Sequence, residues 1–239
     1  MKTINDLNIK LFADGAGLDS FMNLNELEYI KGFTTNPSLM RKNGVENYKD
    51  FSVQLLSKIN DKPISFEVFA DEMLEMEKQA NEIASWGKNI FIKIPITNTK
   101  GKSTKELVKK LINKKISCNV TAIFTFEQVK EIVDVVDSET PVILSIFADR
   151  IADTGVDPVP LMKKIVSYSK NKSNIEILWA STREALNIFQ ANECGCQIIT
   201  VPTDILEKMK YLGKDLNQFS KETVLTFYND AKSAKYKIT

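Results

Sequence analysis

Lys93 lies in a segment whose other residues are mostly apolar and β-branched, Phe91–Thr97. Such a run predicts a strand buried on both faces, where a lysine is costly unless it is paired or used chemically. Burial disfavours an ammonium and favours the free amine, which attacks carbonyl carbons to form a Schiff base. Two ordinary alternatives are a strand-end lysine whose amine reaches water and a buried ion pair with Glu67.

Polar side chains also stand at the ends of the other apolar segments. One such residue means little, since strands often finish in a turn or a cap. Glu67 is more informative, because its carboxylate interrupts the apolar run Ser65–Phe69. The strand-end set in chain order is Asp14, Thr34, Thr35, Asn36, Glu67, Lys93, Asn119, Thr121, Ser145, Arg150, Ser181 and Arg183.

This set fits a Schiff-base aldolase, which needs an amine, an acid–base group and groups that order a water. We assign Asp14 to the proton of the substrate hydroxyl beside the breaking C–C bond. Glu67 and Thr121 are predicted to hold the water that carries protons while the Schiff base forms. Asn36 and Asn119 are predicted to bind substrate hydroxyls.

Arginine is rare in this chain, which has only Arg41, Arg150 and Arg183. A guanidinium binds carboxylate or phosphate through two parallel hydrogen bonds, a geometry that lysine lacks. Arg150 and Arg183, together with Ser181, are therefore predicted to hold an anionic end of the substrate. Arg41 falls in a turn region and receives no such role.

Composition narrows the classes of function. The chain has 239 residues, a net charge of +1 and 43% hydrophobic residues, which suits one domain over residues 1–239. Balanced charge favours neither nucleic acid nor a membrane as partner, and the first residues, which have no apolar core segment, predict no signal peptide. The absence of histidine excludes Ser-His-Asp catalysis and histidine-bound zinc. The cysteines predict no disulfide framework and no metal site, and so a reducing cytoplasm; they are Cys118, Cys194 and Cys196.

Apolar, β-rich segments alternate with amphipathic ones along the chain. The predicted strands are Lys10–Ala13, Tyr29–Thr34, Ile64–Phe69, Ile90–Ile94, Ile116–Val120, Val142–Phe147, Ile175–Ala180 and Gln197–Val201. The predicted helices are Asp71–Trp86, Ser103–Lys114 (with a capping box of Ser103 and Glu106), Phe126–Val136, Asp157–Ser169 and Arg183–Ala191.

Eight such repeats predict an α/β fold, a (β/α)₈ TIM barrel, whose strand ends would gather the polar set at one mouth. A doubly wound sheet is the alternative, but its glycine fingerprint is absent. The remaining segment, Leu216–Ala234, is amphipathic. It predicts an extra C-terminal helix within residues 214–239 that covers the barrel or packs on a neighbouring subunit.

Four segments carry a resemblance to a known family: Gly32–Ser38, Ile92–Thr97, Asn119–Thr121 and Ala180–Arg183. They resemble the signature segments of transaldolases, in particular the small transaldolase / fructose-6-phosphate aldolase group. The similarity extends from about Leu11 to Pro202.

The resemblance implies a barrel, class I chemistry on small-molecule sugar phosphates without metal or cofactor, and a homo-oligomer whose C-terminal helix packs on a neighbour in a ring. It implies that Lys93 forms the Schiff base, that Asp14 is the acid–base group, and that Glu67 and Thr121 hold water. The implied phosphate-binding residues are Arg150 and Arg183.

Glu67 and Phe147 match the family's transferases, since its simple aldolases have Gln and Tyr there. The leading hypothesis is therefore transfer of a dihydroxyacetone unit between sugar phosphates, as in the pentose phosphate pathway, with Phe147 and Ser145 at the substrate. The alternatives are a lyase that releases dihydroxyacetone, a transaldolase acting on a modified sugar, and a non-catalytic barrel that binds a sugar phosphate.

Three features depart from the family pattern. Gly15 and Ala16 follow the acid–base aspartate, where the family usually has a hydroxyl residue next. Asp149 precedes Arg150, where transaldolases usually have glycine, and Trp179 adds bulk before Ser181. A carboxylate beside a phosphate-binding arginine repels an anionic ligand or holds the arginine differently, so these departures predict an altered substrate.

Overall fold

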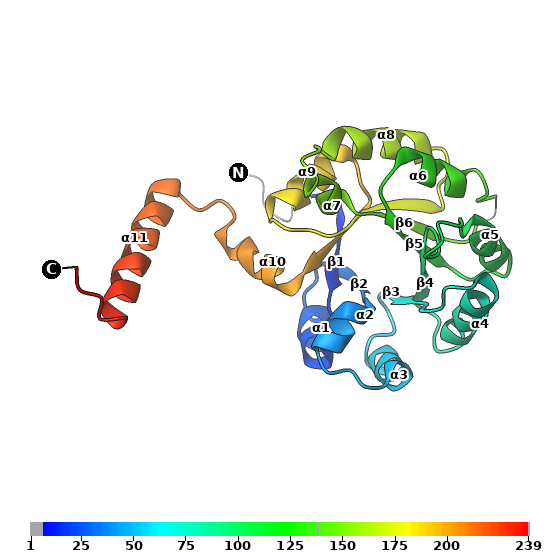
Figure 1. Ribbon diagram of the computed structural model, residues 1–239, viewed down its shortest axis with the longest axis horizontal. Helices are drawn as coiled ribbons and strands as arrows, with labels where there is room; N and C mark the ends of the chain where they lie inside the picture. Colours follow the sequence, from blue (N-terminus) through cyan, green and yellow to red (C-terminus); the bar gives the residue numbers. More distant parts are fainter. Residues whose placement is uncertain (1–6, 138, 239) are drawn as a thin grey trace.

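The computed structural model describes residues 7–137 and 139–238. Within these residues, eight parallel strands pair in chain order and close into a barrel, with β8 returning to β1 (Figure 1). The predicted (β/α)₈ barrel is therefore confirmed. The strands are β1 (Lys10–Asp14), β2 (Ile30–Thr34), β3 (Ile64–Glu67), β4 (Ile90–Pro95), β5 (Cys118–Ile123), β6 (Val142–Ile146), β7 (Ile175–Trp179) and β8 (Ile198–Pro202).

Helices cover the outside of the barrel. Several of the connecting helices are too short for a helical period to show in the sequence, notably those at Pro37–Lys42, Ala148–Ala152 and Thr203–Lys208. In the described part of the chain, no helix combines the length and apolar character needed to cross a membrane. The helices are α1 (Leu18–Asn25), α2 (Pro37–Lys42), α3 (Tyr48–Lys58), α4 (Met73–Ala84), α5 (Lys105–Asn113), α6 (Phe126–Val133), α7 (Ala148–Ala152), α8 (Val159–Ser169), α9 (Leu186–Cys194), α10 (Thr203–Lys208), the 3₁₀ helix η2 (Met209–Tyr211) and α11 (Leu216–Ser233).

The predicted capping box of Ser103 and Glu106 is wrong. Helix α5 begins beyond Ser103, whose hydroxyl instead donates to the Glu131 carboxylate at 2.6 Å. The N-cap of the helix lies one residue later than predicted, at Thr104, and the Thr104 hydroxyl donates to the carbonyls of Pro95 (2.7 Å) and Ile96 (3.1 Å). A complete capping box is found at α6, where Thr125 and Gln128 satisfy each other's backbone N–H groups.

The helix predicted to start at Arg183 begins later, at Leu186. The side-chain oxygen of Asn187 accepts hydrogen bonds from the backbone N–H groups of Arg183 (3.1 Å) and Glu184 (2.8 Å). These bonds stabilise a loop ahead of α9. Arg183 therefore belongs to the loop that follows β7 rather than to a helix.

Apolar side chains pack on both surfaces of the strands, which is why the strands appear in the sequence as nearly continuous apolar runs. The larger cluster lies between the strands and the helices, and includes the fully buried Ile64, Ile92 and Val120. A smaller cluster surrounds Phe12 and includes Ile143.

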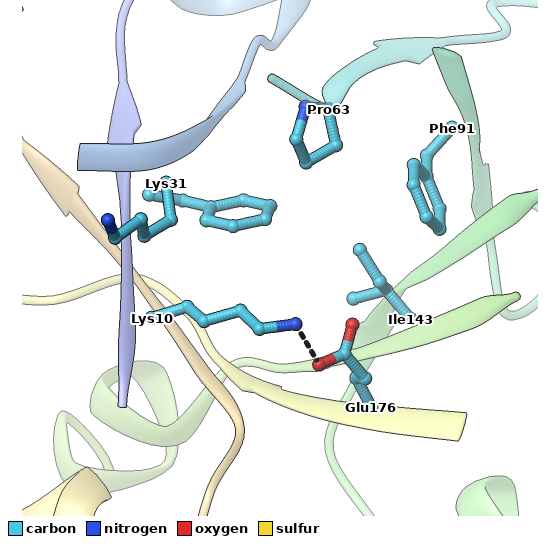
Figure 2. A pocket seen from close by; sticks show the side chains of 7 residues that line it. Lys10, Lys31, Pro63, Phe91, Ile143 and Glu176 are labelled. Carbon is cyan, nitrogen blue, oxygen red and sulfur yellow. Dashed lines mark hydrogen bonds and ion pairs between the residues drawn. The ribbon is translucent and has the colours of Figure 1, made fainter. Parts of the chain in front are cut away.

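The amino-terminal end of the barrel holds a hollow of about 300 Å³ with mainly aromatic and aliphatic walls (Figure 2). The Lys10 ammonium donates to the Glu176 carboxylate at 2.7 Å across this end. Both side chains are partly exposed, so this ion pair adds little stability. The reactive side chains singled out above, by contrast, stand at the other ends of the strands.

Helix α11 lies apart from the barrel at the end of the chain (Figure 1). None of its residues is buried, and Val224, Phe227 and Tyr228 are 62%, 68% and 62% exposed. The amphipathic helix predicted from the sequence is thus present, but it does not cover its own barrel. Packing on a neighbouring subunit stays a prediction.

Gly32 is a point where only glycine fits. A Cβ atom there would lie 2.6, 2.7 and 2.8 Å from three ring carbons of Phe12, its buried register partner on β1. We expect Gly32→Ala to lower the free energy of unfolding by about 1–3 kcal/mol, because overpacking forces the ring or the strand to move. Urea denaturation measures the change. Gly15→Ala is the control, since its nearest neighbours would be ring carbons of Phe21 at an ordinary contact distance of 3.5 Å; equal losses in both variants would contradict the explanation.

Candidate active site

A cavity of about 550 Å³ opens at the carboxyl-terminal ends of the strands. This is the end at which barrel enzymes carry their chemistry. Nearly all site residues predicted from the sequence line it, although they come from segments far apart in the chain. They are Asp14, Asn36, Glu67, Lys93, Thr121, Ser145, Phe147, Arg150, Ser181 and Arg183.

Lys93 is buried, with only 8% of its surface exposed. Strand pairing places it level with Glu67 on β3 and Asn119 on β5. Its Nζ atom lies 3.2 Å from the Glu67 carboxylate and donates to the carbonyl of Thr35 at 2.9 Å. The buried ion pair that the sequence suggested is thus present. It holds the amine at the cavity wall.

Asp14 lines the same cavity, at the end of β1. Its carboxylate accepts a hydrogen bond from the Thr34 hydroxyl at 2.8 Å, and that hydroxyl also lies 2.5 Å from the hydroxyl of Thr200. Burial raises the pKa of Asp14, and the charge of Lys93 and the Thr34 hydrogen bond offset only part of the rise. A carboxyl group with a raised pKa exchanges its proton closer to neutral pH, which suits acid–base catalysis.

Thr121 presents an unsatisfied hydroxyl. Its Oγ1 atom is buried and has no hydrogen-bond partner within the described part of the chain. The strand is irregular here: the register of β5 against β6 shifts between Val120 and Ile123, and Ala122 has a left-handed φ of 58°. Bulges of this kind re-aim side chains beside active sites. Because a buried hydroxyl without a partner costs about 1–3 kcal/mol, Thr121 is suited to bind a water or substrate atom.

Asn119 does not line the cavity. It is fully buried, and its side-chain amide donates to the Ser65 hydroxyl at 3.0 Å. Its side-chain oxygen accepts from the Ser145 hydroxyl at 2.7 Å. The result is a polar row across β3, β5 and β6. Of its members, only Ser145 reaches the cavity, so Asn119 acts on any ligand through that hydroxyl.

Asn36 has a structural role that the sequence did not reveal. Its side-chain oxygen caps α2 by accepting from the backbone N–H of Leu39 at 2.9 Å, and Pro37 follows as the first residue of the helix. Substituting such a cap typically costs about 1 kcal/mol. The oxygen is therefore engaged, whereas the amide nitrogen remains suited to a substrate hydroxyl.

Two arginines also line the cavity. The guanidinium of Arg150 lies 5.2 Å from the ring centre of Phe147. That of Arg183 is ion-paired with Asp153 at 2.9 Å, and both of these side chains are more than half exposed. Ser181, which also lines the cavity, has a left-handed φ of 69°. An anionic group entering here meets two cations, one of which must first loosen a weak surface ion pair.

The two unusual residues noted in the sequence, Asp149 and Trp179, contact each other. The indole N–H of Trp179 donates to the Asp149 carboxylate at 2.6 Å. Both are buried, and neither lines the cavity. This bond joins the start of α7, next to Arg150, to the end of β7. Burial raises the pKa of Asp149 to about 6, while the hydrogen bond from Trp179 and the charge of Arg183 act in the opposite direction.

Sequence reasoning missed Thr200 and Tyr48. Thr200 stands in the middle of β8, where a hydroxyl within an apolar run was the signal that could have revealed it. Tyr48, whose hydroxyl contacts the backbone of Glu67 on both its N–H and C=O, begins a helix that shows no clear pattern. Within the described residues, no three His, Cys, Asp or Glu side chains gather to form a metal site.

Comparison with known proteins agrees with this geometry. The sequence model of the family described as Transaldolase/Fructose-6-phosphate aldolase matches residues 11–238. A protein of Clostridium kluyveri named probable transaldolase is 37% identical over 202 residues, covering 84% of this chain and 89% of that protein. A protein of the same name from Clostridioides difficile is 33% identical over 220 residues, covering 90% and 96%. One from Methanococcus maripaludis is 31% identical over 202 residues, covering 84% and 89%.

Asp149 should make stability depend on pH. Its pKa rises from an ordinary 3.8 to about 6 in the folded protein, so the folded state binds a proton more tightly than the unfolded state. The contribution of Asp149 to the free energy of unfolding therefore falls as pH rises from about 4 to 6. We expect Asp149→Asn, which keeps an acceptor for Trp179, to be more stable relative to wild type at pH 7.5 than it is at pH 4.5.

Urea denaturation at the two pH values measures this difference. Asp71→Asn is the matched control. Hydrogen bonds from Thr99 lower the pKa of Asp71, so it stays ionised across this range in both states. Its effect on stability should be equal at the two pH values. A stability difference for Asp149→Asn that does not change with pH would contradict the assignment.

Proposed function

Since the chain belongs to the transaldolase/fructose-6-phosphate aldolase family, we propose that it is a class I transaldolase. It moves a dihydroxyacetone unit from a ketose phosphate to an aldose phosphate through a Schiff base on Lys93. The observation that carries this proposal is the buried Lys93 amine, held between Glu67 and Thr35 at the wall of the cavity.

The reaction begins when the Lys93 amine attacks the ketone carbon of the donor. The carbinolamine that forms must lose its oxygen as water, which requires a proton to be delivered. Glu67, which lies 3.2 Å from the amine, and the unpartnered hydroxyl of Thr121 hold the water that carries this proton. Loss of water leaves an iminium ion on Lys93.

Asp14 then accepts the proton of the hydroxyl beside the bond to be cleaved. The C–C bond breaks, its electron pair moves into the iminium group, and an aldehyde leaves. The protein retains a three-carbon enamine on Lys93. The enamine attacks the carbonyl of an incoming aldose phosphate, Asp14 returns its proton to the new hydroxyl, and hydrolysis frees the amine.

Transfer rather than release is favoured by the residue beside the enamine. Phe147 lines the cavity and has no hydroxyl with which to protonate a carbanion. Ser145 and the amide of Asn36 bind substrate hydroxyls, and Arg150, Arg183 and Ser181 bind the phosphate. The buried Asp149 places a negative charge near this phosphate, which supports a preference for a modified sugar phosphate or another anionic ketose.

Borohydride trapping tests the proposal. Wild-type protein incubated with fructose 6-phosphate and sodium borohydride should gain a reduced three-carbon adduct, located on Lys93 by intact mass and peptide mapping. Lys93→Met should gain none. Lys10→Met removes a lysine at the opposite end of the barrel and should trap as wild type does.

The acceptor dependence of the same reaction separates the alternatives. Release of glyceraldehyde 3-phosphate that continues only with an aldose phosphate acceptor supports the transferase. Free dihydroxyacetone without an acceptor would instead establish the lyase. Absence of an adduct with fructose 6-phosphate and with other anionic ketoses would reject Schiff-base catalysis and favour a barrel that only binds sugar phosphates.

We also propose that the protein is a homo-oligomer in which α11 packs on a neighbouring copy. Apolar side chains exposed on this helix would otherwise remain in water. We expect Phe227→Asp to reduce the mass in solution, measured by light scattering, from a multiple of 27.0 kDa to that of one chain. Asn229→Asp adds the same charge on the opposite face and should leave the mass unchanged. Equal masses for the two variants and the wild type would argue against this interface.

A further inference from the structure

The barrel sheet opens between β2 and β3 at the cavity. The two strands pair only through Phe33 with Ile64 and Thr34 with Ser65. The last backbone bond between them runs from the N–H of Thr35 to the carbonyl of Ser65. The chain then turns into α2 at Pro37, which has no N–H to donate, so the ladder ends there.

Glu67 extends beyond this last bond. Neighbouring residues of a strand direct their backbone groups to opposite sides, and Val68 donates to Lys93 on the β4 side. The N–H and C=O of Glu67 therefore face the side that β2 has left. Left unpaired, buried backbone groups of this kind are costly.

Two side chains replace the missing strand. The Tyr48 hydroxyl accepts from the Glu67 N–H at 2.8 Å and donates to the Glu67 carbonyl at 3.1 Å. The Thr35 carbonyl accepts from Lys93 Nζ at 2.9 Å. At this opening, the Lys93 amine is thus bonded to the chain that leaves β2, and the Tyr48 hydroxyl is bonded to the edge of β3.

Tyr48 is itself held firmly. It is the first residue of α3, and its ring packs edge-on against Phe66, Phe69 and Trp86 at centroid distances of 6.3, 4.5 and 6.0 Å. Burial also raises the pKa of Tyr48, so the phenol keeps the proton that it donates to the carbonyl. A fixed, protonated hydroxyl in this place defines where the backbone of Glu67 lies.

We propose that Tyr48 is a positioning residue that holds the Glu67 carboxylate beside Lys93. This role rests on the proposed function, in which Glu67 orders the water for Schiff-base formation. Tyr48 does not line the cavity, so it acts through Glu67 alone. Without its hydroxyl, both backbone groups of Glu67 lose their partner, and the carboxylate leaves its place 3.2 Å from the amine.

Tyr48→Phe tests the role because it removes the hydroxyl and keeps the aromatic packing. Misplacing a catalytic group by about 1 Å can cost on the order of 100-fold in rate. We expect kcat with fructose 6-phosphate and an aldose phosphate acceptor to fall roughly 10- to 100-fold, with KM within about threefold of wild type. The rate of borohydride-trappable adduct formation on Lys93 should fall by a similar factor.

Tyr168→Phe is the matched control. It removes a hydroxyl that donates to Asp134 at 2.8 Å, from a ring that packs edge-on against Phe126 on the outside of the barrel. Its kcat should stay within about twofold of wild type. Normalising kcat to the final amount of trapped Lys93 separates loss of rate from loss of folded protein.

The outcomes are distinct. A slower Tyr48→Phe with unchanged final trapping supports the positioning role. A kcat within twofold of wild type, or a loss that disappears on normalisation, would overturn it while the wild type still turns over. A wild type that forms no adduct would instead reject the proposed function.

Discussion

The arrangement of the candidate active site depends on how the buried amine of Lys93 is held. Lys93 is buried in β4, where it is flanked in the chain by the fully buried Ile92 and Ile94, and an unpaired charge there would be very costly. The structure meets that cost with the Glu67 carboxylate on the adjacent strand and with the carbonyl of Thr35. The carbonyl is free to accept this bond because the backbone pairing of β2 with β3 ends at Thr35, just ahead of Pro37. The placement of the amine therefore depends on where the pairing of β2 with β3 ends.

The two ends of the barrel differ in chemistry because the strands differ along their length. Near their starts the inward side chains include Phe12, Phe91 and Ile143, and the polar contact across the hollow there is a partly exposed ion pair (Figure 2). Near their ends stand hydroxyls, amides and charges that hydrogen-bond across strands. Side-chain hydrogen bonds that join Ser65, Asn119 and Ser145 across three strands restrain the side chains at this end. Rigid support of this kind keeps catalytic groups in place.

The part of the cavity lined by Arg150 and Arg183 is electrostatically mixed. Arg150 and Arg183 stand beside carboxylates, of which Asp149 is buried and Asp153 is exposed. Trp179 supplies the hydrogen bond that makes the buried carboxylate tolerable, so the two unusual residues explain each other. A glycine in place of Asp149 would leave the indole N–H without this acceptor. The pair is best understood as one unit that links the β6 and β7 connections behind the part of the cavity wall that carries Arg150 and Arg183.

The sequence alone determined the barrel and the set of residues at its mouth. Both follow from local patterns: apolar runs bounded by turns predict strands, and polar residues at their ends converge because parallel strands end together. Tertiary structure decided how those residues are used. It buried Asn119 beneath the cavity, committed the Asn36 oxygen to a helix cap, joined Asp149 to Trp179 and brought Tyr48 to Glu67. These contacts depend on hydrogen bonds between side chains on different elements, whose partners no local pattern records.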